Sequence, residues 1–134
     1  ISKKTKAIVP VHFTGYMTYM PKIMKLSKKY KLHVVEDACQ SILANIEGKN
    51  SGTWGKAGAF SLHPLKNINV WSDGGIITTN DKNLFKSLLL LRNHGLKNRD
   101  EVEICGYNSR LDTFQAVVGN WLLPKAKQIL YNLK

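Results

Sequence analysis

Residues 59–75, AFSLHPLKNINVWSDGG, join a short apolar run to a loop that ends in two glycines. Residues 59–62 have the composition of a short buried strand, and residues 75–79, GIITT, that of a second one. Lys66 stands in the connection between these two strands. Basic side chains usually lie where water reaches them. Lys66 is therefore either a solvated loop residue or a nucleophile that the flanking strand holds in place.

Outward from this connection, the chain alternates predicted strands with predicted helices. Short apolar runs indicate strands, and apolar residues three or four apart indicate helices. Such alternation is typical of an α/β layer architecture, which we predict here. The predicted strands cover residues 6–13, 32–38, 59–62 and 75–79, and the predicted helices cover residues 18–31, 80–95 and 109–123.

Local signals mark the ends of these elements. Pro10 interrupts or ends the first strand, and Thr18 is a candidate N-cap of the first helix. Residues 47–58 hold four glycines and are predicted as loop or turn throughout. The other predicted boundaries are a helix cap at Asn80 or Asp81, a helix stop at Gly95, and capping-box spacing at Ser109 and Asp112.

The composition describes a basic chain with enough apolar residues for one core. The chain has 134 residues, 43% of them hydrophobic, and a formal net charge of +11. Residues 1–35 hold eight lysines and no carboxylate. Such a surface could attract nucleic acid, anionic lipid or a phosphorylated small molecule, or it could simply be solvated. We favour the solvated surface, because the lysines are not interleaved with aromatic residues as in a base-stacking surface.

Several functional classes lack their motifs. Lys49 is followed by asparagine and lacks the upstream glycine of a phosphate-binding loop, and the glycines of residues 52–58 are spaced GxxGxxG rather than GxGxxG. The four histidines lie far apart and the two cysteines have no metal or redox spacing, so no metal site is predicted. The cysteine content favours a cytoplasmic setting in which both thiols are reduced. A disulfide between Cys39 and Cys105 is the alternative. No apolar run approaches the length of a membrane span.

Polar side chains follow two of the predicted strands. Asp37 ends one strand, Ser61 ends another, and Lys66 lies five residues beyond Ser61. In open α/β sheets such strand ends face the ligand crevice. A lysine nucleophile, a carboxylate for a protonated ring nitrogen and a hydroxyl for a phosphate are what pyridoxal phosphate requires. A helix cap, a turn-forming serine and a solvated lysine remain the alternatives at these positions.

Six segments in order resemble one enzyme family. These segments are VPVHFTG, VVEDACQS, GTWGKAGAFSLHPLKN, SDGGIITTND, LRNHG and GYNSRLDTFQAVVG, and they cover nearly all of residues 7–123. They resemble the DegT/StrS-type sugar-nucleotide aminotransferases, which are fold type I pyridoxal-phosphate enzymes. The resemblance implies part of an α/β/α large domain, with a mostly parallel mixed sheet flanked by helices. It further implies an internal fragment, in which residues 1–123 form the C-terminal part of the cofactor-binding domain and residues 124–134 a helix leading toward a small domain.

The resemblance assigns roles to five residues. Lys66 matches the lysine that binds the cofactor covalently and then moves protons between cofactor and substrate. Asp37 matches the partner of the pyridine nitrogen, Gln40 lies against the cofactor near its 3-hydroxyl, and Ser61 binds the phosphate. Asn108 matches an asparagine that a neighbouring subunit contributes to the phosphate site, which implies a homodimer with shared active sites.

Three further residues of these segments, His63, Arg110 and Gln115, receive no assigned role. The implied reaction moves an amino group from an amino acid, expected to be L-glutamate, to a keto sugar linked to a nucleoside diphosphate, in amino-sugar biosynthesis. No nucleic-acid or membrane partner is expected, and the chain alone should be inactive. One alternative is a sugar dehydratase of the same family, in which histidine replaces the lysine. The other is a basic binding or regulatory protein that kept the fold and lost the chemistry.

Overall fold

The computed structural model describes residues 1–133, which contain a four-stranded sheet of order β1-β2-β5-β6. These strands are β1 (Ala7–Ile8), β2 (His33–Asp37), β5 (Ala57–Ser61) and β6 (Gly75–Thr78). The first three run parallel, and β6 pairs antiparallel with β5. The sheet is therefore mixed and mainly parallel, and the carboxyl ends of β1, β2 and β5 lie at one edge.

The first predicted strand is shortened, as Pro10 led us to expect. Regular pairing covers only Ala7 and Ile8, and a single further bridge joins Val11 to Asp37. Pro10 cannot donate a ladder hydrogen bond. The backbone nevertheless stays beside β2, because the N–H of His12 donates to the carbonyl of Asp37 at 2.9 Å.

The prediction that residues 47–58 form only loop was wrong in part. They contain β4 (Lys49–Asn50), which pairs with β3 (Asn45–Ile46), and the beginning of β5. Glu47 and Gly48 turn this hairpin with φ values of 53° and 77°. Positive φ at both positions is typical of two-residue hairpin turns, but glutamate gives no signal for it.

The first helix, α1, spans Met20–Tyr30, with Pro21 in its first turn. The prediction of Thr18 as its N-cap was wrong. The Thr18 hydroxyl donates instead to the carbonyl of Val11 at 2.9 Å, and the Thr18 N–H donates to Nδ1 of His12. Thr18 thus fastens the segment before the helix, and Tyr19 at the cap position has no side-chain hydrogen bond.

The second helix, α2 (Lys82–Leu91), begins at one of the two predicted caps. Asp81 accepts hydrogen bonds from two backbone N–H groups of the first turn. Gly95 lies past the helix end with φ of 72°, and its N–H donates to the carbonyl of Leu90. Glycine is favoured at such a left-handed position, but α2 already ends at Leu91, four residues before the predicted stop.

The third helix, α3 (Thr113–Leu122), has a capping box one turn later than predicted. Asp112 is the N-cap, and its reciprocal partner is Gln115. Ser109 does not cap, because the helix begins only at Thr113. Its N–H donates to the carbonyl of Arg92 and holds it beside the end of α2. The chain continues through η2 (Leu123–Lys125) and α4 (Ala126–Asn132), so residues 124–132 begin with a 3-10 turn; residue 134 lies outside the described residues.

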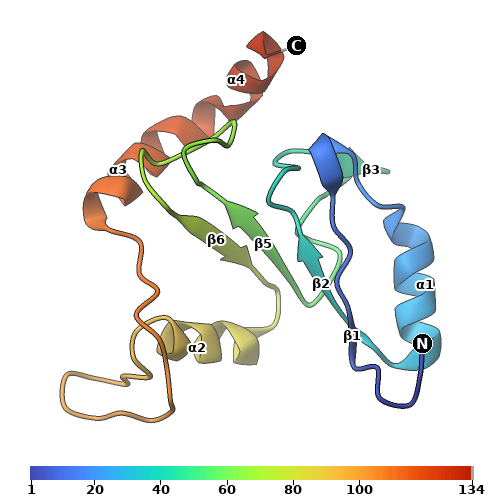
Figure 1. Cartoon of the computed structure of the whole chain (residues 1–134), viewed down its shortest axis with the longest axis horizontal. Coiled ribbons are helices and arrows are strands. Elements are labelled where there is room, and N and C mark those ends of the chain that lie inside the picture. Colours follow the sequence, from blue (N-terminus) through green and yellow to red (C-terminus); the bar gives the residue numbers. More distant parts are fainter. Residues whose placement is uncertain (134) are drawn as a thin grey trace.

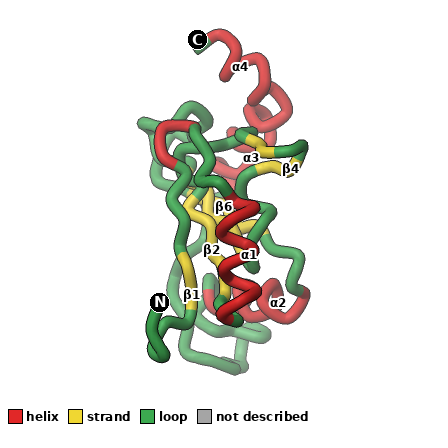
Figure 2. The backbone as a smooth tube through the Cα atoms, turned by 90° about the vertical axis from the view of Figure 1, so that its right-hand side faces the viewer, coloured by secondary structure: helices red, strands yellow, loops and turns green. Residues whose placement is uncertain are grey.

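The helices lie at both ends of the sheet (Figure 1). α1 runs along the edge formed by β1 and β2, whereas α2 and α3 lie on the side of β6. Figure 2 shows α1 in front of the strands, with the two termini at opposite ends of the molecule. Leu62, Ile68 and Val70 are buried with Ala126 in one core cluster. This core fastens the β5–β6 connection, including the segment that carries Lys66.

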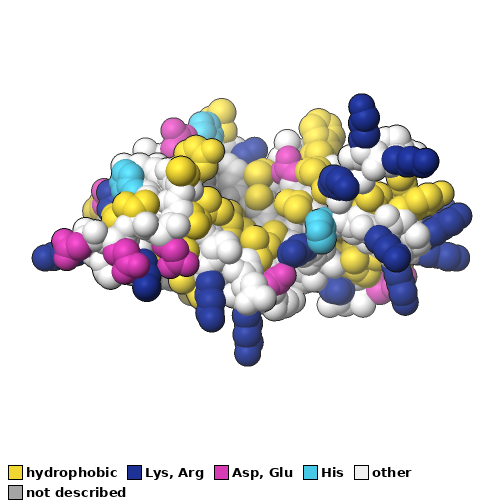
Figure 3. Space-filling model, turned by 90° about the horizontal axis from the view of Figure 1, so that it is seen from below, with side chains coloured by type: hydrophobic (Ala, Val, Ile, Leu, Met, Phe, Trp, Pro, Cys, Tyr) yellow, Lys and Arg dark blue, Asp and Glu magenta, His cyan; other side chains and the backbone are white. Residues whose placement is uncertain are grey.

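The positive charge is concentrated where α1 lies. Figure 3 shows Lys and Arg side chains gathered at that end of the molecule. Lys22 lies over the ring of Tyr19 and Lys29 over the ring of Tyr30, so aromatic residues do accompany these lysines. None of the described helices is both long and apolar enough to cross a membrane.

Candidate functional site

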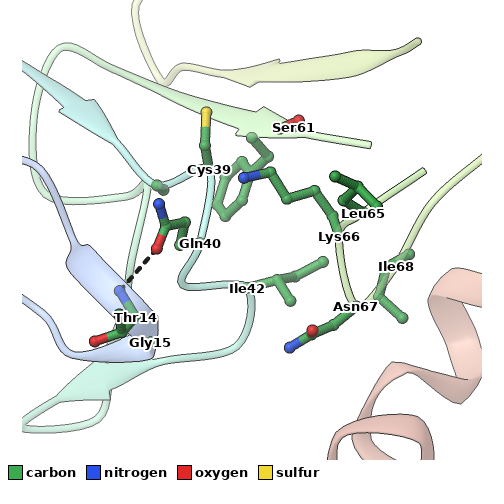
Figure 4. A pocket seen from close by; sticks show the side chains of 12 residues that line it. Thr14, Gly15, Cys39, Gln40, Ile42, Ser61, Leu65, Lys66, Asn67 and Ile68 are labelled. Atoms are coloured by element: carbon green, nitrogen blue, oxygen red, sulfur yellow. Dashed lines mark hydrogen bonds between the residues drawn. The ribbon is translucent and has the colours of Figure 1, made fainter. Parts of the chain in front are cut away.

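A pocket of about 320 Å³ lies at the carboxyl ends of β2 and β5 (Figure 4). Three segments form it: the turn η1 (Phe13–Gly15), the residues after β2, and the β5–β6 connection. This is the edge of a parallel sheet at which ligands bind in α/β folds. Its lining residues are Thr14, Gly15, Ala38, Cys39, Gln40, Ile42, Phe60, Ser61, Leu65, Lys66, Asn67 and Ile68.

Lys66 is a pocket residue and is partly shielded from water. Its side chain is half-buried and reaches across the pocket toward Cys39 (Figure 4). Its backbone N–H donates to the carbonyl of His63 at 2.8 Å, which closes a turn. Buried Leu62 and Ile68 hold the two sides of that turn in the core. A partly desolvated amine on a fixed backbone is the arrangement that a lysine nucleophile needs.

Asp37 and Lys66 both act on the thiol of Cys39, which lies in this pocket. Oδ1 of Asp37 accepts the N–H of Cys39 at 3.1 Å. Burial raises the pKa of the Cys39 thiol above its ordinary value of 9.0, the hydrogen bond and negative charge of Asp37 raise this pKa further, and the charge of Lys66 lowers it. The structure therefore brings the charges of the predicted carboxylate and the predicted amine close to one side chain, the thiol of Cys39.

Ser61 and Gln40 offer hydrogen-bond donors in the same pocket. Oγ of Ser61 accepts the N–H of His63 at 3.3 Å, so its own hydroxyl proton is available to a ligand. Oε1 of Gln40 accepts the N–H of Thr14 at 2.9 Å, which leaves the amide NH₂ group as the donor. Hydroxyl and amide donors suit the oxygen atoms of an anionic ligand.

Asn108 lies apart from these four residues. It lines a second cavity, of about 960 Å³, between β6 and α2. Nε of Arg110 donates to Oδ1 of Asn108 at 3.2 Å, and the same guanidinium reaches Oδ1 of Asn93 at 3.4 Å. Within one chain, Arg110 thus orients Asn108, and Asn108 does not line the pocket of Lys66.

His63 supports the turn that carries Lys66. Its Nδ1 accepts the N–H of Leu65 at 3.1 Å, and its Nε2 lies 3.7 Å from Oδ1 of Asp73. Gln115 donates to the backbone carbonyl of Asp73 at 2.6 Å, so α3 is fastened to the same loop. These contacts give His63 and Gln115 structural places beside the pocket.

Sequence reasoning missed two parts of this site. Thr14 and Gly15 form a wall of the pocket. Thr14 has a φ of 50°, which no sequence signal predicts for a threonine. Glu36 and His12 are fully buried and bonded to each other at 3.0 Å, each two residues before a residue that lines the pocket. The signal that could have found Glu36 is its position inside a strand, where an unpaired carboxylate is not tolerated. Within residues 1–133, no cluster of His, Cys, Asp or Glu side chains is placed to hold a metal ion.

Comparison with known proteins decides the family. The model of the DegT/DnrJ/EryC1/StrS aminotransferase family matches residues 1–132. The chain belongs to this family. The resemblance drawn from the six sequence segments is therefore confirmed.

One similar relative is the UDP-N-acetyl-3-dehydro-alpha-D-glucosamine 3-aminotransferase of Acidithiobacillus ferrooxidans. It is 46% identical over 118 residues, which cover 88% of this chain and 32% of that protein. The chain thus spans about a third of the length of the relative it matches.

Two solved structures share the fold. DesV of S. venezuelae, solved with a ketimine intermediate, is 37% identical with a TM-score of 0.91, over 96% of this chain and 34% of DesV. NtdA of Bacillus subtilis, solved with its bound cofactor PMP, is 34% identical with a TM-score of 0.81, over 89% of this chain and 27% of NtdA. The predicted α/β fold of a type I pyridoxal-phosphate enzyme is confirmed.

Proposed function

We propose that this protein is a pyridoxal-phosphate-dependent aminotransferase of amino-sugar biosynthesis. It moves an amino group from an amino acid, L-glutamate in our proposal, to a keto sugar linked to a nucleoside diphosphate. Family membership and the printed activity of the Acidithiobacillus ferrooxidans relative support this proposal. The observation that carries it is the half-buried amine of Lys66 in a pocket that also holds Ser61 and Gln40 and adjoins Asp37.

The residues of the pocket fit pyridoxal phosphate. Ser61 has a hydroxyl proton and Gln40 an NH₂ group for anionic oxygens. Asp37, which adjoins the pocket without lining it, has a carboxylate for a protonated ring nitrogen. Apolar side chains of Phe60 and Ile42 line the remaining wall. The volume of about 320 Å³ is within the range of ligand pockets. When bound, pyridoxal phosphate supplies an electron sink for the carbon that loses its proton.

The side chains of this chain then hold and move protons. Nζ of Lys66 is the group that takes a proton from one carbon and returns it to another, which requires an amine held within reach of both. A carboxylate charge at Asp37 favours the protonated form of a ring nitrogen placed beside it. Only one oxygen of Asp37, Oδ1, is bonded to Cys39. The other oxygen is the acceptor that we assign to this ring nitrogen.

The proposal includes a cytoplasmic homodimer with shared active sites. In one chain Asn108 lies in a different cavity from Lys66, and Arg110 holds its side chain. We infer that Asn108 serves the pocket of a second copy. Residues 1–123 would then belong to the cofactor-binding domain, and residues 124–134 would lead toward a small domain.

The two alternatives are less well supported. A sugar dehydratase of this family has histidine in place of the lysine, and this chain has Lys66. A binding or regulatory protein without chemistry would have no need for Asp37, Ser61 and Lys66 around one pocket. We therefore advance no second function.

An absorption titration tests the proposal. The protein expressed from its complete reading frame is titrated with pyridoxal phosphate, beside Lys66→Ala and the control Lys86→Ala, an exposed lysine of α2. Wild type and Lys86→Ala should show the visible band of cofactor bound covalently to lysine, and L-glutamate should bleach it. Lys66→Ala should lack the band. A wild-type protein without the band would overturn the proposal.

A further inference from the structure

His12 and Glu36 form a fully buried pair that the proposed reaction does not use. Each side chain is 0% exposed, and Nε2 of His12 lies 3.0 Å from Oε2 of Glu36. Nδ1 of His12 accepts the backbone N–H of Thr18 at 3.3 Å. Since Nδ1 is an acceptor, the ring proton lies on Nε2 and is donated to Glu36.

Three more donors converge on Glu36. The N–H groups of Trp54 and Gly55 donate to Oε1 at 2.7 and 2.8 Å, and the N–H of Gly52 donates to Oε2 at 2.9 Å. A buried carboxylate is tolerated only with such partners. Glu36 thereby joins β2, the loop of residues 51–55 and the segment that begins at His12. Glu36 stands one residue before Asp37 and two before Ala38, which lines the pocket.

The segment that His12 anchors includes a turn of unusual backbone geometry. η1 follows His12 immediately, and within it Thr14 has a φ of 50° and Gly15 a φ of 87°. A residue with a side chain holds positive φ only where its surroundings impose it. Here His12 is fastened before the turn, and Thr18 after it is fastened to both His12 and Val11. The anchors therefore lie on both sides of Thr14.

The turn controls the orientation of a pocket residue. The N–H of Thr14 donates to Oε1 of Gln40 at 2.9 Å. Figure 4 shows the amide of Gln40 with its oxygen toward Thr14 and its nitrogen on the opposite side, toward Cys39. Without this bond, the amide could turn over and present its oxygen to the pocket. A carbonyl oxygen facing an anionic ligand would repel it.

We propose that the His12–Glu36 pair positions Gln40 for cofactor binding, by holding the turn whose Thr14 N–H fixes the Gln40 amide. His12 and Glu36 are positioning residues, since neither lines the pocket. The inference rests on the proposed function in one respect only, namely that the pocket binds pyridoxal phosphate. It adds to that function the residues which hold the Gln40 amide with its NH₂ group free for the ligand.

A double-mutant cycle tests whether His12 acts through Gln40. His12→Asn keeps an oxygen near the place of Nδ1 but removes the donor to Glu36. In the protein from its complete reading frame, we expect His12→Asn to weaken pyridoxal-phosphate binding by about tenfold. In the Gln40→Ala background, the same substitution should change the dissociation constant by less than about twofold. The exposed His33 supplies the control His33→Asn, which should bind as wild type does.

Two conservative variants sharpen the cycle. Gln40→Glu still accepts from Thr14 but has no donor, so it should lose as much affinity as Gln40→Ala. Thr14→Gly keeps the N–H that bonds Gln40 and permits positive φ, so this change in the pocket wall should cost far less affinity than Gln40→Ala. If His12→Asn does not fold, His12→Gln takes its place, because its amide nitrogen can still reach Glu36 while the acceptor for Thr18 is lost.

Amide exchange gives a second readout that needs no cofactor. The N–H of Thr14 should be protected in the cofactor-free wild type and should exchange about tenfold faster in both His12→Asn and Gln40→Ala. Equal losses of affinity from His12→Asn in the two backgrounds, or unchanged protection of Thr14, would overturn the inference. A wild type that binds no cofactor would overturn the proposed function instead, and the exchange rates would still decide whether His12 holds the turn.

Discussion

The carboxylates of Glu36 and Asp37 lie on opposite faces of β2, one in the interior and the other beside the pocket. Successive side chains of a strand alternate between its faces. Glu36 is therefore turned inward, where four donors surround it, while Asp37 is half-buried beside the pocket and bonded to Cys39. One strand end thus supplies both an anchor of the fold and a candidate cofactor ligand.

The thiol of Cys39 should report the charges of its two neighbours. Asp37→Asn removes a charge that raises the pKa of Cys39, whereas Lys66→Ala removes one that lowers it. We expect the alkylation of Cys39 by iodoacetamide at pH 8 to be about threefold faster in Asp37→Asn and slower in Lys66→Ala. Rates are measured on the cofactor-free protein by peptide mass spectrometry.

The exposed Cys105 is the internal control for this experiment, because its alkylation should be the same in all three proteins. Changes of the same sign in both variants would contradict the arrangement of Asp37 and Lys66 about the thiol.

Removal of the negative charge of Glu36 should destabilise the fold strongly. Glu36→Gln places an NH₂ group where a backbone N–H now donates, so one buried donor loses its acceptor. We expect the free energy of unfolding in urea to fall by about 3 kcal/mol. Glu101→Gln removes a charge that is bonded at the surface to Lys97 and Asn98, and it should change the free energy of unfolding by less than about 0.5 kcal/mol. Equal effects of the two substitutions would show that the buried contacts of Glu36 do not stabilise the protein.

Two glycines should respond differently to alanine. A Cβ on Gly58 would lie 2.3 Å from Cα of Gly52, whose N–H donates to Glu36. Overpacking of this kind should lower the free energy of unfolding by about 2 kcal/mol. Gly48 has positive φ but open space around it, so Gly48→Ala should cost about 1 kcal/mol. Urea unfolding of both variants measures the difference, and a reversed order would contradict the close packing at Gly58.

The N-cap of α2 should make stability depend on pH. The N–H of Leu84, followed by that of Asn83 and by Lys56, holds the pKa of Asp81 below its ordinary value of 3.8. The ionised cap therefore stabilises the fold above pH 3.8, and this contribution is lost as the pH falls through the lower pKa of the folded state. Asp81→Asn keeps a cap oxygen without the charge. Urea unfolding at pH 7 should show that wild type is more stable than Asp81→Asn. This difference in the free energy of unfolding should shrink in acid. A difference independent of pH would contradict the role of the charge.

The sequence by itself determined the alternation of strands and helices, a helix cap at Asn80 or Asp81, and the family. These follow from short-range patterns, because periodicity, capping and the end of a strand depend on near neighbours. The same locality explains the errors. Threonine is a residue type that often caps helices, but the hydroxyl of Thr18 donates to the carbonyl of Val11 instead. Glu47 adopts a positive φ that only the pairing of β3 with β4 requires.

Only the tertiary structure decided how these residues meet. The sheet order brings η1, the end of β2 and the β5–β6 connection to one edge, and this order joins segments more than twenty residues apart. It brings the N–H of Thr14 to the amide oxygen of Gln40 and the ring of His12 to the carboxylate of Glu36. It leaves Asn108 in a different cavity from Lys66. Such contacts depend on which strands pair, and the pairing is set by burial over the whole sheet rather than by any short stretch of sequence.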